Sequence, residues 1–513
     1  MPMARLLLTL FAALFAALFV AGAAAQPRAE PPPPPPPPPP ACTHCKEKLL
    51  TVEALRAALP AAWSVKTEPE PVMGGEMLTV RAGPPQAPRL LLVHGLGQNG
   101  FTDWLPVLPQ LARRWRVLAV DLPGFGYSSS PVAKLSPTNY ARVLDSLLAR
   151  DGSGPIVVVG HSLGGAVALR LAADHPQRVS KLVLVDAAGI LQRTAFTKHT
   201  ASVPLSVDGM PEPLKEPVAR LRDLGNLIVE RLFGLPNDPT GVLRANEALW
   251  GLALRDRATV NAALALVDEN FSAAVHTLAQ PVHLIWGEAD PIAPLRTGEL
   301  LARRLPKAQL VSLPGVGHVP MDQATAAFQV LLDNALQNPP APRPEPPAAT
   351  EAPQDVLCKG QVARRYSGRY RELRLEGCSA AVLTDVVADR IVIRDSIVQM
   401  TGVQVRSDDV ALDITNSELI ATASDFEGRL AIRADLSRLD LAGVRLAARG
   451  FAVQAAGRSR FVASVSEVRD AFYTGWWHDD RELEGELLDP RSPPRLLTSP
   501  LPLPLPGASA PAR

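Results

Sequence analysis

At 513 residues the chain is too long for one ordinary hydrophobic core, so we expect about two or three folding units. A hydrophobic share of 47% and a charged share of 20% are typical of soluble globular proteins. The formal net charge of +1, without a run of lysine or arginine, gives no reason to expect nucleic acid as a partner. The 52 prolines cluster in segments that predict linkers.

The first 25 residues have the features of an export signal. Arg5 supplies the positive start, an apolar stretch covers residues 6–20, and Ala23–Ala25 offers an Ala-x-Ala cleavage site. We therefore predict that residues 1–25 are a signal peptide and that the mature protein is periplasmic or secreted. The alternative is an uncleaved membrane anchor, because the apolar run with its alanines approaches the roughly 20 residues that span a bilayer.

Proline-rich segments divide the rest of the chain. Residues 26–45 contain ten consecutive prolines and a C-x-x-C sequence, and residues 339–355 are again rich in proline. The tail at 490–513 has low complexity and is predicted to be disordered. These segments delimit a central domain at 46–338 and a C-terminal domain at 356–489.

Export makes the four cysteines potential disulfide partners. The spacing of Cys358 and Cys378 would allow a disulfide that pins the start of the C-terminal domain. For Cys42 and Cys45 a local disulfide is the simplest interpretation. A metal site there lacks a second pair of ligands nearby, and haem attachment would need histidine where Lys46 stands.

Apolar runs alternate with helical stretches between residues 75 and 336, which predicts a mostly parallel sheet covered by helices. Runs this apolar suit strands that are buried on both faces. The helices that connect them include 166–174 and 295–304. The predicted strands are Leu90–Val93, Val117–Val120, Ile156–Val159, Leu182–Val185, Val282–Trp286 and Gln309–Leu313.

Residues from about 190 to 276 break this rhythm, since they lack clear strands and contain helical stretches at 217–233 and 243–257. We predict a helical cap over the strand ends. Its side chains Leu227, Phe233 and Trp250 would either line an apolar pocket or form the interior of the cap itself.

From Leu373 onward, short apolar strands followed by turn residues recur at roughly 18 to 27 residues, as in stacked solenoid coils. Examples are IVIRDS, LDITNS and LDLAGV. We predict a small parallel β-helix, with an ordinary β-sandwich as the alternative.

The sequence Gly160-His161-Ser162-Leu163-Gly164 lies between a predicted strand and a predicted helix. In this context G-x-S-x-G indicates a nucleophilic serine on a tight turn. The serine hydroxyl needs a base, and His318 is the candidate because it follows the last strand in the loop PGVGH. His94 and His161 are bound into motif backbones and are interpreted as structural.

Asp290 is the candidate acid that orients this base, because it directly follows a strand and gives the chain order Ser, Asp, His. Asp186 also ends a strand and is the second candidate, with Glu288 as a third. Donors for an oxyanion are expected from the backbone N–H of Leu163 and from that of Leu96, in the loop HGLG.

Together, HGLGQNG, DLPGFGYS, GHSLGG, WGEAD and GVGHVP resemble the α/β-hydrolase superfamily, in its branch with a cap. The resemblance covers about half of the chain, from Gly75 to Leu336. It implies a doubly wound, mostly parallel sheet. Epoxide hydrolases and haloalkane dehalogenases share the layout but have Asp in place of Ser162, and the HGGG loop of another esterase group is absent.

The expected function is that of an exported serine hydrolase that cleaves carboxylic esters through an acyl-enzyme on Ser162. The expected substrate is a small ester with an apolar acyl group, and no metal or organic cofactor is implied. One alternative is hydrolysis of a carbon–carbon bond in a diketone-like substrate. The other is an envelope-binding protein, whose C-terminal domain contacts the cell envelope and whose hydrolase domain is secondary or inactive.

Overall fold

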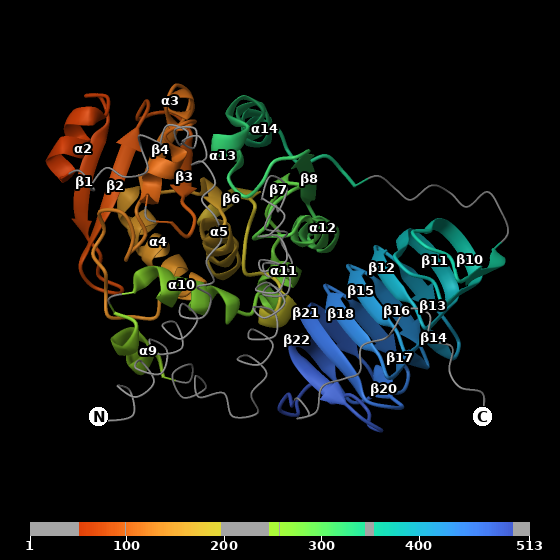
Figure 1. Cartoon of the computed structure of the whole chain (residues 1–513). Coiled ribbons are helices and arrows are strands. Elements are labelled where there is room, and N and C mark those ends of the chain that lie inside the picture. Colours follow the sequence, from red (N-terminus) through yellow and green to blue (C-terminus); the bar gives the residue numbers. More distant parts are fainter. Residues whose placement is uncertain (1–50, 98, 196–245, 256, 344–352, 496–513) are drawn as a thin grey trace, which may run out of the picture. The chain divides into compact units, whose positions relative to one another are not determined.

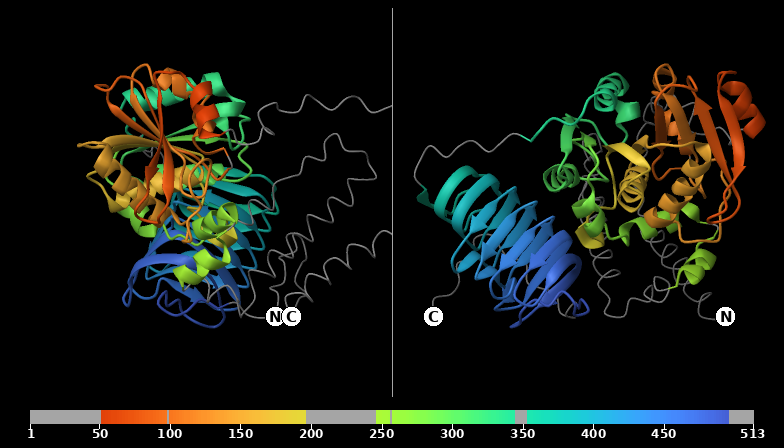
Figure 2. Two further views of the ribbon diagram at one scale, coloured as in Figure 1. Left: turned by 90° about the vertical axis from the view of Figure 1, so that its left-hand side faces the viewer. Right: turned by 180° about the vertical axis from the view of Figure 1, so that it is seen from behind.

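A computed structural model of the chain describes residues 51–97, 99–195, 246–255, 257–343 and 353–495 (Figures 1 and 2). Several predictions fall outside these ranges: the signal peptide, the linker with Cys42 and Cys45, and the cap side chains Leu227 and Phe233. No helix within the described ranges has the length and apolar composition needed to cross a bilayer.

The central domain contains an eight-stranded sheet in the order β1-β2-β4-β3-β5-β6-β7-β8. All pairs from β4 to β8 along this order are parallel, which confirms the predicted fold class. Each of the six predicted strands is present with nearly the predicted bounds. They are β3 (Arg89–Val93), β4 (Arg116–Val120), β5 (Ile156–His161), β6 (Val179–Val185), β7 (Val282–Gly287) and β8 (Ala308–Leu313).

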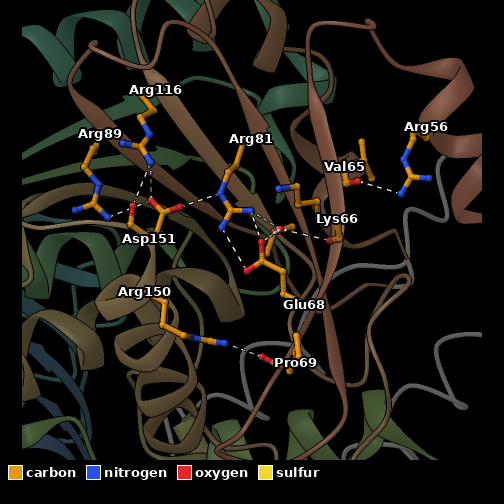
Figure 3. A network of polar contacts seen from close by, with 11 residues as sticks. Arg56, Val65, Lys66, Glu68, Pro69, Arg81, Arg89, Arg116, Arg150 and Asp151 are labelled. Atoms are coloured by element: carbon orange, nitrogen blue, oxygen red, sulfur yellow. Dashed lines mark hydrogen bonds and ion pairs between the residues drawn. The ribbon is translucent and has the colours of Figure 1, made fainter.

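The strands β1 (Ser64–Pro69) and β2 (Glu76–Ala82) extend one edge of the sheet and were not predicted. They pair antiparallel with each other, and β2 pairs antiparallel with β4. Polar residues of both strands form a network (Figure 3). In it, the guanidinium group of Arg81 contacts Glu68 at 2.5 Å and Asp151 at 2.8 Å. Strand β1 is mostly polar, and in β2 the buried apolar residues are interrupted by Thr79, so detection by long apolar runs misses this edge.

Helices cover both faces of the sheet, because successive side chains of each strand point to opposite faces. In β3, Leu91 and Val93 join one hydrophobic cluster, whereas Leu90 and Leu92 join the other. The first cluster includes side chains of α4 (Pro137–Asp151), α5 (Leu163–Asp174) and α12 (Leu295–Arg304). The second includes side chains of α2 (Val52–Ala58), α3 (Leu108–Leu111) and α14 (Thr325–Gln337). Short helices at η1 (Gly100–Trp104) and α13 (Pro320–Gln323) lie in loops.

The described part of the predicted cap contains α9 (Glu247–Ala253), α10 (Ala258–Val267) and α11 (Ser272–Thr277). The helix predicted at 243–257 is therefore shorter than expected. Trp250 is buried, and its Nε1–H donates to Asn261 Oδ1 at 2.7 Å. Of the two roles considered for Trp250, the structure supports packing within this region.

The C-terminal domain is a solenoid of parallel strands, consistent with the predicted β-helix (Figure 1). Strands pair parallel from one coil to the next, for example β12 with β15 and β15 with β18, which excludes the β-sandwich. A disulfide joins Cys358 to Cys378, as the spacing suggested. The strands are β9 (Gln354–Lys359), β10 (Arg365–Glu376), β11 (Ala381–Arg394), β12 (Ile397–Thr401), β13 (Gln404–Arg406), β14 (Val410–Thr415), β15 (Glu418–Thr422), β16 (Asp425–Gly428), β17 (Leu430–Asp435), β18 (Arg438–Ala442), β19 (Arg445–Ala448), β20 (Val453–Ala455), β21 (Ser459–Arg469) and β22 (Thr474–Leu483).

Both ends of this domain extend beyond the predicted bounds. Strand β9 begins at Gln354, within the segment predicted as linker. At the other end, Glu482 N–H donates to Arg495 O at 2.9 Å, so part of the predicted tail packs on the solenoid.

A ladder of buried serines connects the coils at one corner of the solenoid. The backbone N–H of Ser396 donates to Ser417 Oγ at 3.0 Å, and Ser417 N–H donates to Ser437 Oγ at 3.2 Å. Ser437 N–H continues the ladder to Ser459 Oγ at 3.1 Å. Partners are 20 to 22 residues apart, which is the length of one coil. The ladder thus satisfies buried backbone donors where the chain turns and strand pairing is interrupted.

The two domains contact each other through α12, within the compact unit that residues 52–513 form. Arg296 donates to both oxygens of Asp440, at 2.7 and 2.8 Å. Arg304 is buried and donates to Gly443 O at 2.5 Å. Ala442 of the solenoid belongs to the hydrophobic cluster of the central domain. The domains are therefore joined by more than the linker.

We expect Ser417→Ala to lower the free energy of unfolding by about 1–3 kcal/mol, because it leaves the buried N–H of Ser396 without its acceptor. Urea denaturation monitored by circular dichroism measures this change. Ser367→Ala, at an exposed position, is the control and should change little. Equal stability of the two variants would show that the ladder contributes no net stabilisation.

Candidate active site

Ser162 lies on the turn between β5 and α5, in a backbone conformation that non-glycine residues rarely adopt (φ 52°). The flanking glycines make this turn possible. A Cβ at Gly160 would lie 2.2 Å from Gly164 O, and one at Gly164 would lie 2.2 Å from Val93 O. Only glycine allows the helix to begin this close to the strands.

His318 and Asp290 complete a chain of hydrogen bonds with this serine. His318 Nε2 lies 2.8 Å from Ser162 Oγ, and His318 Nδ1 lies 2.7 Å from Asp290 Oδ2. Asp290 is buried, and its Oδ1 accepts from the backbone N–H groups of Ile292 and Ala293, at 2.7 and 3.0 Å. The loops after β5, β7 and β8 thus bring together three side chains that are far apart in sequence.

The two other candidate acids have different partners. Asp186 Oδ1 accepts from Gly287 N–H at 2.8 Å, and Glu288 Oε1 accepts from Ser312 Oγ at 2.7 Å. Since it is Asp290 that pairs with the His318 ring, the acid predicted first has the geometry that the prediction requires.

The two predicted oxyanion donors belong to segments that adjoin Ser162. Leu163 is the first residue of α5, so its N–H has no carbonyl partner within the helix. The loop that carries Leu96 approaches from β3, and a Cβ added to Gly95 would lie 3.2 Å from Ser162 Cβ. A carbonyl oxygen of a substrate bound at Ser162 would therefore lie near the start of α5 and the Leu96 loop.

The ring of His94 binds the backbone of the loop that carries Leu96. Its Nε2 accepts from Leu122 N–H at 2.9 Å, so Nδ1 carries the proton and donates to Gly95 O at 2.7 Å. Burial lowers the pKa of His94 to about 4, and the ring is neutral near pH 7. The interpretation of His94 as a structural residue agrees with these contacts.

His161, also interpreted as structural, has a more specific position than the sequence indicated. Its Nε2–H donates to the backbone oxygen of His318 at 2.7 Å, and the two rings lie 5.0 Å apart. Burial and the neighbouring His318 lower the pKa of His161 to about 3. The residue before the serine thus holds the loop of the candidate base. Its place in the G-x-S-x-G motif is the sequence signal that marks this residue.

Asp121 anchors the loop DLPGFGYS. Its Oδ1 accepts from Phe101 N–H at 2.6 Å and its Oδ2 from Tyr127 N–H at 2.8 Å. Burial raises the pKa of Asp121 to about 7, although both hydrogen bonds lower it. Asp121 thus holds together the loops that carry Phe101 and Tyr127.

Within the described ranges, no group of three His, Cys, Asp or Glu side chains forms a metal-binding cluster.

A family model described as alpha/beta hydrolase fold matches residues 88–325, which contain all of these loops. An uncharacterized protein of Mycobacterium tuberculosis is 34% identical over 257 residues, covering 47% of this chain and 73% of that protein. A pimeloyl-(acyl-carrier protein) methyl ester esterase of Aromatoleum aromaticum is 31% identical over 256 residues, covering 49% of this chain and 98% of that protein. Lipase 1 of Psychrobacter immobilis is 28% identical over 261 residues, covering 49% and 77%.

We expect the wild type to lose stability relative to His161→Gln as the pH falls below 6.5. An unfolded imidazole takes up a proton there, whereas the folded His161 does so only near its pKa of about 3. The difference should grow by about 1.4 kcal/mol per pH unit. Glutamine is chosen because its amide can still donate to His318 O.

Urea denaturation of both proteins at pH 7 and at pH 5 measures this effect, and the pair of values at pH 7 is the internal control. An unchanged difference between the two pH values would mean that His161 is not held in its neutral form.

Proposed function

Because this chain belongs to the α/β-hydrolase family, we propose that it is a serine hydrolase that cleaves carboxylic esters through an acyl-enzyme on Ser162. The observation that carries the proposal is the position of the His318 ring. One of its nitrogens lies 2.8 Å from Ser162 Oγ and the other lies 2.7 Å from Asp290 Oδ2.

In this proposal the Ser162 hydroxyl attacks the ester carbonyl while His318 Nε2 accepts its proton. The imidazolium keeps its Nδ1–H bonded to Asp290, whose buried carboxylate stabilises the positive ring. His318 then protonates the departing alkoxide. A water molecule subsequently attacks the acyl-enzyme, with His318 again as the base, and releases the acid.

The negative charge on the carbonyl oxygen during attack would be stabilised by the N–H groups of Leu163 and Leu96. The start of α5 adds the favourable end of the helix dipole. Because Ser162 is held in a strained turn by its glycine neighbours, these donors need not reorganise during the reaction.

Esters with an apolar acyl group are the proposed substrate class. Relatives named as a methyl ester esterase and as a lipase support ester hydrolysis. The side chain of Leu96, in the loop beside Ser162, is only partly buried and would offer an apolar contact to an acyl chain.

Export to the periplasm or beyond the cell is proposed as well. It is supported by the signal-like sequence of residues 1–25 and by the disulfide between Cys358 and Cys378, since disulfides persist in oxidising compartments. The solenoid, which such a location would place near the cell envelope, is the proposed point of envelope contact.

Ser162→Ala should abolish both labelling by a fluorophosphonate probe and hydrolysis of p-nitrophenyl esters, because the nucleophile is removed. The expected loss is about 10⁴-fold or more, as for other serine nucleophiles. Ser153→Ala, in an exposed turn, is the control and should keep wild-type labelling. A folded wild type that neither labels nor hydrolyses any ester in a panel of acyl lengths would refute the proposal.

Expression in a Gram-negative host should yield periplasmic protein whose first residue is Gln26, because cleavage follows the Ala-x-Ala site. Mass spectrometry of the purified protein measures the processed end. Ala25→Phe should block cleavage, since the site needs small residues. Full-length wild type in the membrane fraction would instead indicate the uncleaved anchor.

A further inference from the structure

Asp186 is a second carboxyl group next to the proposed acid. It is fully buried, directly follows β6 and has a left-handed backbone conformation (φ 43°). Its Oδ1 accepts from Gly287 N–H at 2.8 Å, whereas its buried Oδ2 has no hydrogen-bond donor from the described chain. Asp290 lies next to this group, since its own backbone N–H donates to Gly287 O at 3.3 Å, and its carboxyl group interacts with that of Asp186. Two carboxyl groups therefore face each other away from water.

Such a pair cannot carry two negative charges, because each charge would be buried beside a like charge. One proton must be shared, and the hydrogen-bond donors decide where it resides. Asp290 accepts from two backbone N–H groups and from the His318 ring, and all three bonds favour its ionised form. Asp186 accepts from one backbone N–H only.

We propose that Asp186 is a neutral positioning residue that donates a hydrogen bond from its carboxyl group to the Asp290 carboxylate and so orients Asp290 toward His318. A proton on Asp186 Oδ2 turns this buried, unpaired oxygen into a donor, and the Asp290 carboxylate accepts the hydrogen bond. The hydrogen bond adds one more interaction to the charged form of Asp290. In the proposed reaction Asp290 acts only as a carboxylate. A proton that stays on Asp186 keeps Asp290 in this form, which His318 requires as its hydrogen-bond acceptor.

The surrounding ionisable groups are consistent with this assignment. Asp290 faces Asp186 from the loop after β7, and burial together with this neighbour raises the pKa of Asp186 to about 9. His161, from the end of β5, and His318, from the loop after β8, face Asp290. The neutral form of Asp186 would therefore persist until the solution becomes alkaline.

The kinetic test rests on the proposed ester hydrolysis and compares Asp186→Asn with Asp186→Gly. Asparagine keeps both contacts, since its amide oxygen can accept from Gly287 and its amide nitrogen can donate to Asp290. Glycine tolerates the left-handed backbone but removes the donor. At pH 7 we expect Asp186→Asn to keep kcat/KM within about threefold of the wild type and Asp186→Gly to lose about tenfold or more.

The pH profile distinguishes a neutral acid from a merely structural residue. The wild type should lose kcat/KM at alkaline pH, as Asp186 ionises, whereas Asp186→Asn should keep it over the same pH range. Rates measured with Ser162→Ala are subtracted as the background. An alkaline loss that is the same in Asp186→Asn and the wild type would overturn the proposal.

A second measurement needs no substrate. The unfolded Asp186 carboxyl loses its proton above its ordinary pKa of 3.8, whereas the folded one keeps it until about 9, so the wild type loses stability as the pH rises between these values. The Tm of Asp186→Asn minus that of the wild type should therefore increase from pH 5 to pH 9. The exposed variant Asp408→Asn is the control.

A constant Tm difference would mean that Asp186 is ionised in the folded protein, whatever the enzyme hydrolyses. If no ester is hydrolysed but the Tm difference increases, the proposed function fails while the neutral carboxyl group stands.

Discussion

The buried carboxyl group of Asp290 is the constraint on which the arrangement of the active site depends. A buried charge is costly unless hydrogen bonds replace water around it. Here the backbone of the loop after β7 supplies two donors and His318 supplies the third. The position of the imidazole follows from this requirement, because one nitrogen is committed to Asp290 and the other is thereby directed at Ser162.

The loops around this group are held by neutral buried rings and by glycines. His161 binds the backbone of the His318 loop, and His94 binds the backbone of the loop with Leu96. Burial keeps both rings neutral near pH 7, so neither adds a positive charge that would compete with His318 for Asp290. The candidate site thus contains three histidines, of which two hold loops in place and one, His318, contacts Ser162 and Asp290.

The solenoid contacts the central domain at α12, the helix that follows the Asp290 loop. Arg296 lies in the first turn of α12, a few residues after Asp290, and binds Asp440 of the solenoid with two hydrogen bonds. Arg304, at the end of the same helix, is buried against the solenoid. Helix α12 is therefore held near both ends by the C-terminal domain. The solenoid covers this part of the surface of the central domain.

By itself, the sequence determined the parallel strands, the serine turn and the solenoid. Long apolar runs, glycines next to a serine and a repeat of roughly 18 to 27 residues are local patterns with a direct physical cause. The strands β1 and β2 escaped prediction because β1 is mostly polar and the apolar residues of β2 are interrupted by Thr79 and Arg81. The serine ladder escaped because its bonds join residues one coil apart.

The sequence ranked Asp290 before Asp186, but only the tertiary structure shows why Asp290 is the carboxyl group that faces His318. Asp186 and Asp290 both follow strands, and their local sequences differ little in this respect. The outcome depends on the pairing of β6 with β7, which brings Asp186 to Gly287, while the loop after β7 and His318 give Asp290 the larger number of hydrogen-bond donors. Burial, and with it the direction of each pKa shift, arises from packing between segments that are distant in the chain.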